Sequence, residues 1–321
     1  MKRSKITILL AIVLGMTFHS CLDLEPQDQL GGKNMWTSVN DYKQFANTFY
    51  SWTRDFSSVV YDGTHSDKRS DLITYQSYNE FSRGINSIPS SDANYTDNYK
   101  HIRRTNLLLQ NAEAYAKPED IKQYIGEAYF FRAYSYFDLL QLYGDVIITK
   151  KPLDITDPEM KVKRNDRSEV VDLIIDDLNH AVENLPAFKE LTTEEEGRIS
   201  KEGAQAFLSR VALYEGTWQK SRNGNQNTQR SANLLDIAAK AARTVIDAKY
   251  GYTFRLFGTD SETKILGDSA QKYMFILENE KSNPAGIKKS SNHEYIFARR
   301  HDQVLASICL LYTSPSPRDR G

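Results

Sequence analysis

The chain has 321 residues, with 41 Lys and Arg against 42 Asp and Glu and a formal net charge of −1. At roughly 150 residues per domain, this is about two domains' worth of chain. The balanced charge lacks the basic excess by which nucleic-acid-binding proteins attract phosphate, so we expect no nucleic acid partner. Two cysteines supply neither a disulfide framework nor a four-ligand zinc site, which excludes a stapled mini-protein and a zinc finger.

The N-terminus has the pattern of a lipoprotein signal peptide. Three of its first five residues are basic, and residues 6–16 form an apolar run that is too short to cross a bilayer as a helix of roughly 20 residues. Cys21 follows shortly afterwards. We therefore predict a signal peptide over residues 1–20, and a lipidated N-terminus and tether over 21–32 in which acyl chains on Cys21 hold the protein on a membrane. The alternative is a chance free thiol, which is an unusual feature of an exported protein.

The C-terminal segment differs in composition from the sequence that precedes it. Residues 309–321 read CLLYTSPSPRDRG, a sudden change to a Pro- and Ser-rich composition. Composition alone would predict a disordered terminus. Residues 309–319, however, resemble one reading frame of a transposon-type sequencing adapter. We expect residues 309–321 to be an adapter-derived artefact and residues 33–308 to form the folded domain.

Between these ends the hydrophobic periodicity is helical. Apolar residues recur at i, i+3, i+4 and i+7, and Pro, Ser, Asp and Gly stand where such segments begin and end. The motif Ala128-x3-Arg132 with Tyr136 recurs as Ala206-x3-Arg210 with Tyr214. Self-similar helix pairs predict a mainly α fold, a tetratricopeptide-like helical repeat (α-solenoid) with long loops. The expected helices cover residues 99–116, 121–143, 168–185, 200–218 and 233–249.

Charged and aromatic residues in these helices have an ordinary structural interpretation. Glu127 and Arg132 lie about 140° apart around a helix, so we expect each to bond to a neighbouring segment. Six aromatic residues of the helix expected over 121–143 occupy both of its sides and are expected in the core: Phe130, Phe131, Tyr134, Tyr136, Phe137 and Tyr143. Asp176 and Asp177 are expected on a solvated face or as cap partners.

Motifs for catalysis are missing. His293-Glu294 begins a metalloprotease-like string, but residue 297 is Phe, so the second zinc ligand of H-E-x-x-H is absent. The sequence contains no dinucleotide fingerprint, Walker P-loop or nucleophile elbow. A glycosidase carboxylate pair stays open as an alternative, because the separation of two acids is invisible in sequence. We expect no enzyme activity and no cofactor.

A candidate ligand-binding segment lies between residues 52 and 95. It is rich in aromatic and polar residues but has no sustained helical period, and loops on a rigid scaffold commonly carry binding. Tyr75, Tyr78 and Phe81 are spaced to share one side of a turn. The alternative is that these rings only pin the loop to the helices. The predicted ligand-binding residues are Tyr61, Asp67, Tyr75, Tyr78, Asn79 and Phe81.

A series of short motifs occurs in a characteristic order from residue 21 to about 255. The motifs are CLDLEPQD from Cys21, Tyr99-x2-Ile102-x3-Asn106, GEA from Gly126 with Arg132, YGDV from Tyr143, DDL from Asp176, Leu185-Pro186 and GRISK from Gly197. Each is weak alone, but together they resemble the SusD/RagB family. A further segment, Glu294 to Phe297, is similar to the strand-like segment before that family's variable half.

The resemblance implies a surface lipoprotein of the outer membrane that captures oligosaccharides or peptides. Its implied partner is a SusC-like TonB-dependent transporter, to which the ligand is passed for import. It also implies that a C-terminal part of the family's fold is missing from this chain, and no binding residue can be carried over by motif. The alternative function is a membrane-anchored helical-repeat scaffold for other proteins that has no small ligand.

Overall fold

The computed structural model describes the chain from residue 35 to residue 298, with several gaps. The predicted signal peptide, the tether with Cys21 and the segment 309–321 lie outside the described residues and stay predictions. The described residues are 35–54, 70, 72, 80, 83–195, 197–222, 228–277, 281–288 and 291–298.

Helices make up the regular structure of the described residues. Only an isolated antiparallel bridge between Val146 and Asn165 is extended pairing there. The predicted mainly α fold is confirmed. In chain order the elements are α2 (Val39–Asn47), η1 (Thr48–Trp52), α4 (Ala93–Glu113), η3 (Pro118–Ile121), α5 (Lys122–Tyr143), η4 (Pro158–Lys161), α6 (Arg167–Asn184), η5 (Phe188–Glu190), α7 (Lys201–Arg222), α8 (Thr228–Ile246), η7 (Lys264–Ser269) and α9 (Ala270–Tyr273).

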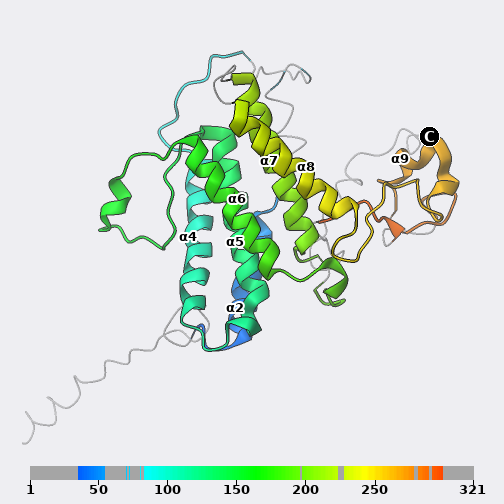
Figure 1. The fold of residues 1–321 in the computed structure, drawn as a ribbon, viewed down its shortest axis with the longest axis horizontal. Helices are drawn as coiled ribbons and strands as arrows, with labels where there is room; N and C mark the ends of the chain where they lie inside the picture. The colour runs from blue at the N-terminus through cyan, green and yellow to red at the C-terminus, as the bar shows by residue number, and fades with distance from the viewer. Residues whose placement is uncertain are drawn as a thin grey trace, which may run out of the picture.

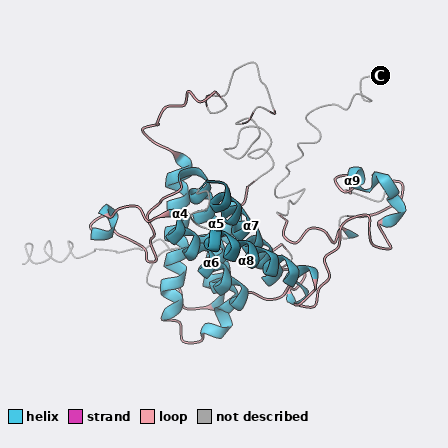
Figure 2. Cartoon of the chain, turned by 45° about the horizontal axis from the view of Figure 1, so that its top comes forward, coloured by secondary structure: helices cyan, strands magenta, loops and turns pink. Residues whose placement is uncertain are grey.

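Each long helix packs chiefly on the next one in sequence. Helix α4 packs on α5, α5 on α6, α6 on α7 and α7 on α8, and Figure 1 shows α4, α5 and α6 side by side with α7 and α8 crossing beside them. Figure 2 shows the same stack from a second direction, with α9 set apart from it. Contacts between sequence neighbours are the mark of a helical-repeat solenoid.

Helix boundaries follow the expected end signals. Pro118 opens the turn before α5, and Gly144 ends that helix with a φ of 72°, a conformation that favours glycine. At the start of α6, Asp166 is the N-cap, and its backbone N–H donates to the Glu169 carboxylate. The Ser200 hydroxyl accepts the Gly203 backbone N–H at the start of α7. These ends lie within a few residues of the predicted ones.

Helix α5 is the central element of the core. Most of its side chains are buried, on all sides of the helix, because it lies between other helices. Of its predicted core aromatics, Tyr134 and Tyr143 are partly exposed. The other four are buried: Phe130, Phe131, Tyr136 and Phe137.

A glycine allows the close approach of α5 to the end of α6. A Cβ at Gly126 would lie 2.9 Å from Leu185 Cγ and 3.0 Å from the Leu185 backbone nitrogen. Leu185 is itself buried. Since a backbone atom cannot rotate away, a side chain here forces the helix and the chain after α6 apart.

We predict that Gly126→Ala lowers the free energy of unfolding. Overpacking of a core costs roughly 1–3 kcal/mol, which outweighs the gain of up to about 1 kcal/mol from higher helix propensity. Urea unfolding monitored by circular dichroism measures the difference. A variant as stable as the parent, or more stable, would contradict the close approach.

Two of the buried ion pairs attach α5 to neighbouring segments. Arg132 donates from Nε and Nη2 to both oxygens of Asp177 at 2.8 and 2.6 Å. Arg198 Nη1 donates to both oxygens of Glu127 at 2.7 Å. The expectation that Glu127 and Arg132 bond to neighbouring segments is confirmed. The expectation for Asp177 is wrong, because its side chain is 1% exposed and lies on the face of α6 that meets α5.

Asp177→Asn therefore should destabilise the fold strongly. Removing the carboxylate leaves the Arg132 charge buried without its partner, which costs about 3–5 kcal/mol. The matched control is Asp176→Asn, since Asp176 is exposed on the same helix and should change stability by no more than about 0.5 kcal/mol. Equal unfolding free energies for the two variants would show that the pair contributes nothing.

A second, smaller core stands at the C-terminal side of the stack. Five buried residues form it, and it is separate from the main core. The residues of this small core are Phe257, Leu266, Ala270, Leu277 and Ile287.

None of the helices in the described part of the chain has the length and apolar character needed to cross a membrane.

Candidate functional site

The ligand-binding residues predicted from sequence fall outside the described part of the chain. They belong to gaps between residues 55 and 82. The structure therefore neither brings them together nor separates them, and they stay predictions. The residues concerned are Tyr61, Asp67, Tyr75, Tyr78, Asn79 and Phe81.

Two aromatic residues at the ends of that segment are described, and both pack on the helices. The Trp52 ring stacks on His101 with centroids 4.1 Å apart and meets Phe131 edge-on. Burial lowers the pKa of His101 to about 4, so its ring is neutral near pH 7. Tyr95 meets Tyr143 edge-on at 5.2 Å. For Trp52 and Tyr95 the interpretation as pins to the scaffold is the correct one.

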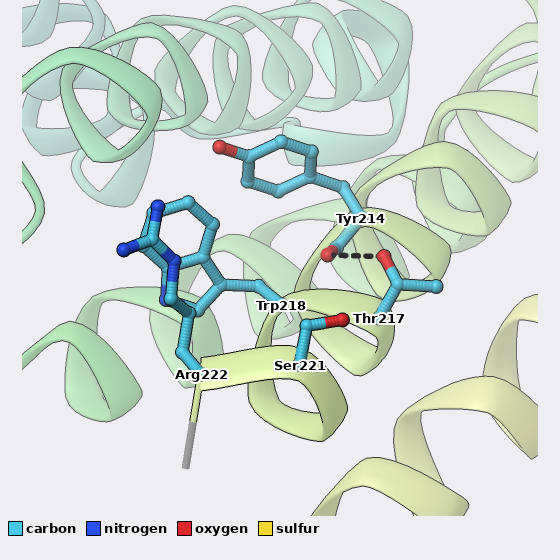
Figure 3. Close-up of a pocket in the computed structure, with 5 residues that line it drawn as sticks. All are labelled: Tyr214, Thr217, Trp218, Ser221 and Arg222. Atoms are coloured by element: carbon cyan, nitrogen blue, oxygen red, sulfur yellow. Dashed lines mark hydrogen bonds between the residues drawn. The ribbon is translucent and has the colours of Figure 1, made fainter. Parts of the chain in front are cut away.

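A pocket of about 300 Å³ lies along the last turns of α7. Its lining residues are spaced by three and four, so they share one face of the helix. Figure 3 shows the two rings and the guanidinium on this face, with the two hydroxyl side chains beside them. The lining residues are Tyr214, Thr217, Trp218, Ser221 and Arg222.

The two rings of the pocket form a nearly continuous surface. Tyr214 and Trp218 are tilted by only 23°, with centroids 6.2 Å apart. The Arg167 guanidinium lies over both, 5.8 Å from the Tyr214 centroid and 4.4 Å from that of Trp218. Arg222 lies 4.7 Å over Trp218. Such contacts between cations and ring faces fix the orientation of the indole.

A buried ion pair attaches this surface to the helix stack. Arg167, at the start of α6, donates from Nε to Glu215 Oε2 at 2.9 Å and from Nη1 to the Leu140 carbonyl at 3.3 Å. Glu215 has a fully buried side chain, and its other oxygen accepts from Gln219 at 2.6 Å. Tyr214 also meets Phe137 of α5 edge-on at 5.4 Å. The rings are thus held by three helices.

The polar groups of the pocket keep capacity for a ligand. Thr217 Oγ1 donates within its own helix, to the carbonyls of Leu213 and Tyr214, and its lone pairs stay available. Ser221 and Arg222 are exposed. Aromatic faces with a few converging polar groups are the usual lining of a small-molecule site, and they suit the C–H faces and hydroxyls of a sugar ring.

Sequence reasoning missed this site. Tyr214 belongs to the weak internal repeat, and the helical period of residues 200–218 predicts a helix without indicating a site on it. The available signal was the spacing Tyr214-x3-Trp218-x3-Arg222, which places two rings and a cation on one helix face. Nothing in that spacing reveals that the face is open, because openness depends on the other helices.

The string His293-Glu294 has contacts of a structural kind. The His293 Nδ1 atom hydrogen-bonds the Tyr252 hydroxyl at 2.7 Å. Glu294 Oε2 accepts the Phe257 backbone N–H at 2.8 Å. Phe297, at the position of the missing ligand, packs against the main core. No group of three His, Cys, Asp or Glu suited to a metal ion occurs among the residues described.

Comparison with known proteins gives relatives of one kind. The chain is 28% identical over 233 residues to SusD-like protein P38 of Formosa agariphila, covering 66% of this chain and 42% of the relative. It is 26% identical over 316 residues to SusD-like protein P2 of the same organism, covering 92% and 59%. The chain thus spans about half the length of the curated relatives it matches.

Solved structures show the same fold. A SusD-like protein from Bacteroides fragilis superposes with a TM-score of 0.60 at 24% identity, covering 85% of this chain and 46% of that one. A SusD-like carbohydrate-binding protein from the same species superposes with a TM-score of 0.52 at 20% identity, covering 71% and 43%. The family sequence profile described as "Starch-binding associating with outer membrane" matches residues 22–213. Since this match covers more than half of the chain, the protein belongs to the SusD-like family.

Proposed function

We propose that this protein is a surface lipoprotein of the outer membrane that binds oligosaccharides and delivers them to a SusC-like TonB-dependent transporter. The observation that carries the proposal is the family match over residues 22–213, whose description names starch binding and the outer membrane. The open aromatic pocket on α7 supports it, because a scaffold without a small ligand has no need of such a surface. The protein captures its ligand without changing it chemically.

Capture depends on the rigidity of the helix stack. The Arg167–Glu215 pair and the contact with Phe137 hold the Tyr214 and Trp218 rings before any ligand arrives. A sugar ring then binds to side chains that are already fixed in the folded protein. Little side-chain entropy is therefore lost on binding. The predicted platform at Tyr75 and Tyr78 is a second contact for a longer oligosaccharide.

We predict that Trp218→Ala weakens oligosaccharide binding about tenfold, the loss that corresponds to one stacking contact of roughly 1–1.5 kcal/mol. Affinity electrophoresis against a panel of neutral and acidic polysaccharides measures it. The control is Tyr295→Ala, which removes a 45% exposed ring outside the pocket and should leave binding unchanged.

The same assay applied to a Tyr75→Ala, Tyr78→Ala double variant separates the two contacts. Loss of binding there, with unchanged helix content and melting temperature, supports the predicted loop platform. Unchanged binding in both the double variant and Trp218→Ala would argue against both contacts. A wild-type protein that binds no polysaccharide of the panel would favour the alternative scaffold function.

The membrane anchor is tested at Cys21. We expect Cys21→Ser to release the protein from the membrane fraction, because no acyl chain can then be attached. Detergent phase partitioning in cells without the transporter measures the release. The control is Cys309→Ser, which removes the other cysteine of the chain and should leave the protein on the membrane. A Cys21→Ser protein that still partitions into detergent would disprove lipid anchoring at this residue.

A further inference from the structure

We infer that the α7 pocket selects anionic sugars, and that Arg222 is the residue that binds their carboxylate or sulfate group. The inference rests on the proposed function, because it names the class of sugar that the proposed binding protein takes. Two observations support it. The Arg222 guanidinium has no carboxylate partner among the described residues, and it lies over the Trp218 ring.

Four other arginines in or beside the helix stack are paired with acids. Arg132 pairs with Asp177, Arg167 with Glu215, Arg198 with Glu127 and Arg230 with Asp172. Arg222 pairs with no carboxylate anywhere in the described part of the chain, although it lies over the same indole as the paired Arg167. Residues 223–227, which follow it, read NGNQN and contain no acid.

Among the residues that the structure describes, the net charge of the pocket therefore comes from Arg222 alone. Arg167 lies over the same rings, but Glu215 neutralises it at 2.8 Å. The five lining residues include no acidic side chain. An anion in the pocket meets one positive charge without any opposing carboxylate, whereas a neutral ligand leaves this charge uncompensated.

Trp218 gives the guanidinium a defined orientation. Arg222 lies over the indole at 4.7 Å, and Figure 3 shows the two groups one over the other beside the Tyr214 ring. A guanidinium that covers a ring with its face keeps its N–H donors in its own plane, and this fork matches a carboxylate or a sulfate in a bidentate way. The neighbouring Tyr214 face and the Ser221 hydroxyl are then placed for the sugar ring that carries the anion.

An arginine in the last turn of a helix also has a plain structural interpretation. Its charge interacts favourably with the negative end of the helix dipole. That role affects the stability of α7 but gives no preference among ligands. Lys220 provides the matched comparison, since it is exposed in the same turn and lies about 200° around the helix from Arg222, away from the pocket.

The test is isothermal titration calorimetry on the full chain with pairs of probes that differ only in charge. One pair is oligogalacturonate and its methyl ester, and the other is a sulfated galactan oligomer and its desulfated form. We expect at least one acidic probe to bind at least tenfold more tightly than its neutral partner. Which pair shows the preference tells whether the recognised group is a carboxylate or a sulfate ester.

Two variants assign the preference to a residue. Arg222→Gln should weaken binding of the acidic probe about tenfold, the value expected for loss of a charge-assisted hydrogen bond, and should bring it close to the neutral probe. Lys220→Gln should keep the full preference. Equal loss in both variants would indicate non-specific attraction and overturn the assignment.

The outcomes also separate this inference from the proposed function. If the protein binds neutral oligosaccharides as tightly as acidic ones, and Arg222→Gln has no effect, the proposed function stands and the anionic selectivity is wrong. If it binds neither these probes nor any polysaccharide of the wider panel, both are wrong. Acidic preference that persists in Arg222→Gln would place the selective residue elsewhere and overturn the role of Arg222.

Discussion

The bidentate pair between Arg132 and Asp177 is the interaction on which the helix stack depends. A buried charge is tolerated only when it is paired and hydrogen-bonded, so the pair requires α5 and α6 to meet in one register. Arg132 Nη1 also donates to the Asn106 side-chain oxygen of α4 at 2.8 Å. Asn106 in turn donates to the carbonyls of Thr149 and Lys151. One guanidinium thereby specifies the arrangement of three helices and of the extended segment after α5.

Another buried pair, Arg167 with Glu215, connects the candidate site to the helix stack. Arg167 begins α6, whose position the first pair sets, and Glu215 lies one residue from Tyr214 on α7. Because Arg167 bonds Glu215 and also covers the ring of Trp218, the aromatic surface moves with the scaffold and not independently of it. Binding sites built on helices in this way are more rigid than sites on loops, which fits the proposed capture of a ligand.

The α7 pocket and the predicted binding loop differ in the groups that they offer to a ligand. The loop between residues 55 and 82 offers many rings and polar groups, the composition of an adaptable contact. The α7 pocket offers few groups, of which the Tyr214 and Trp218 rings are held by neighbours, and it has one charge without a carboxylate partner among the described residues. The loop would add contacts for a longer ligand, and the charge of Arg222 is the feature of the α7 pocket from which we infer a preference for acidic sugars.

The sequence by itself determined the five long helices and their repeat-like stacking, because periodicity, caps such as Ser200 and stops such as Gly144 act within a few residues. It did not indicate α2, and α4 begins six residues before its expected start at residue 99. It also indicated that Glu127 and Arg132 bond outside their own helix, since their spacing excludes a shared face. Only the tertiary structure decided which partners they take, and it placed Asp177 in the core where local pattern suggested solvent. The α7 pocket likewise escaped prediction, because the burial of a side chain and the openness of a helix face depend on segments distant in sequence, which no local pattern of residues records.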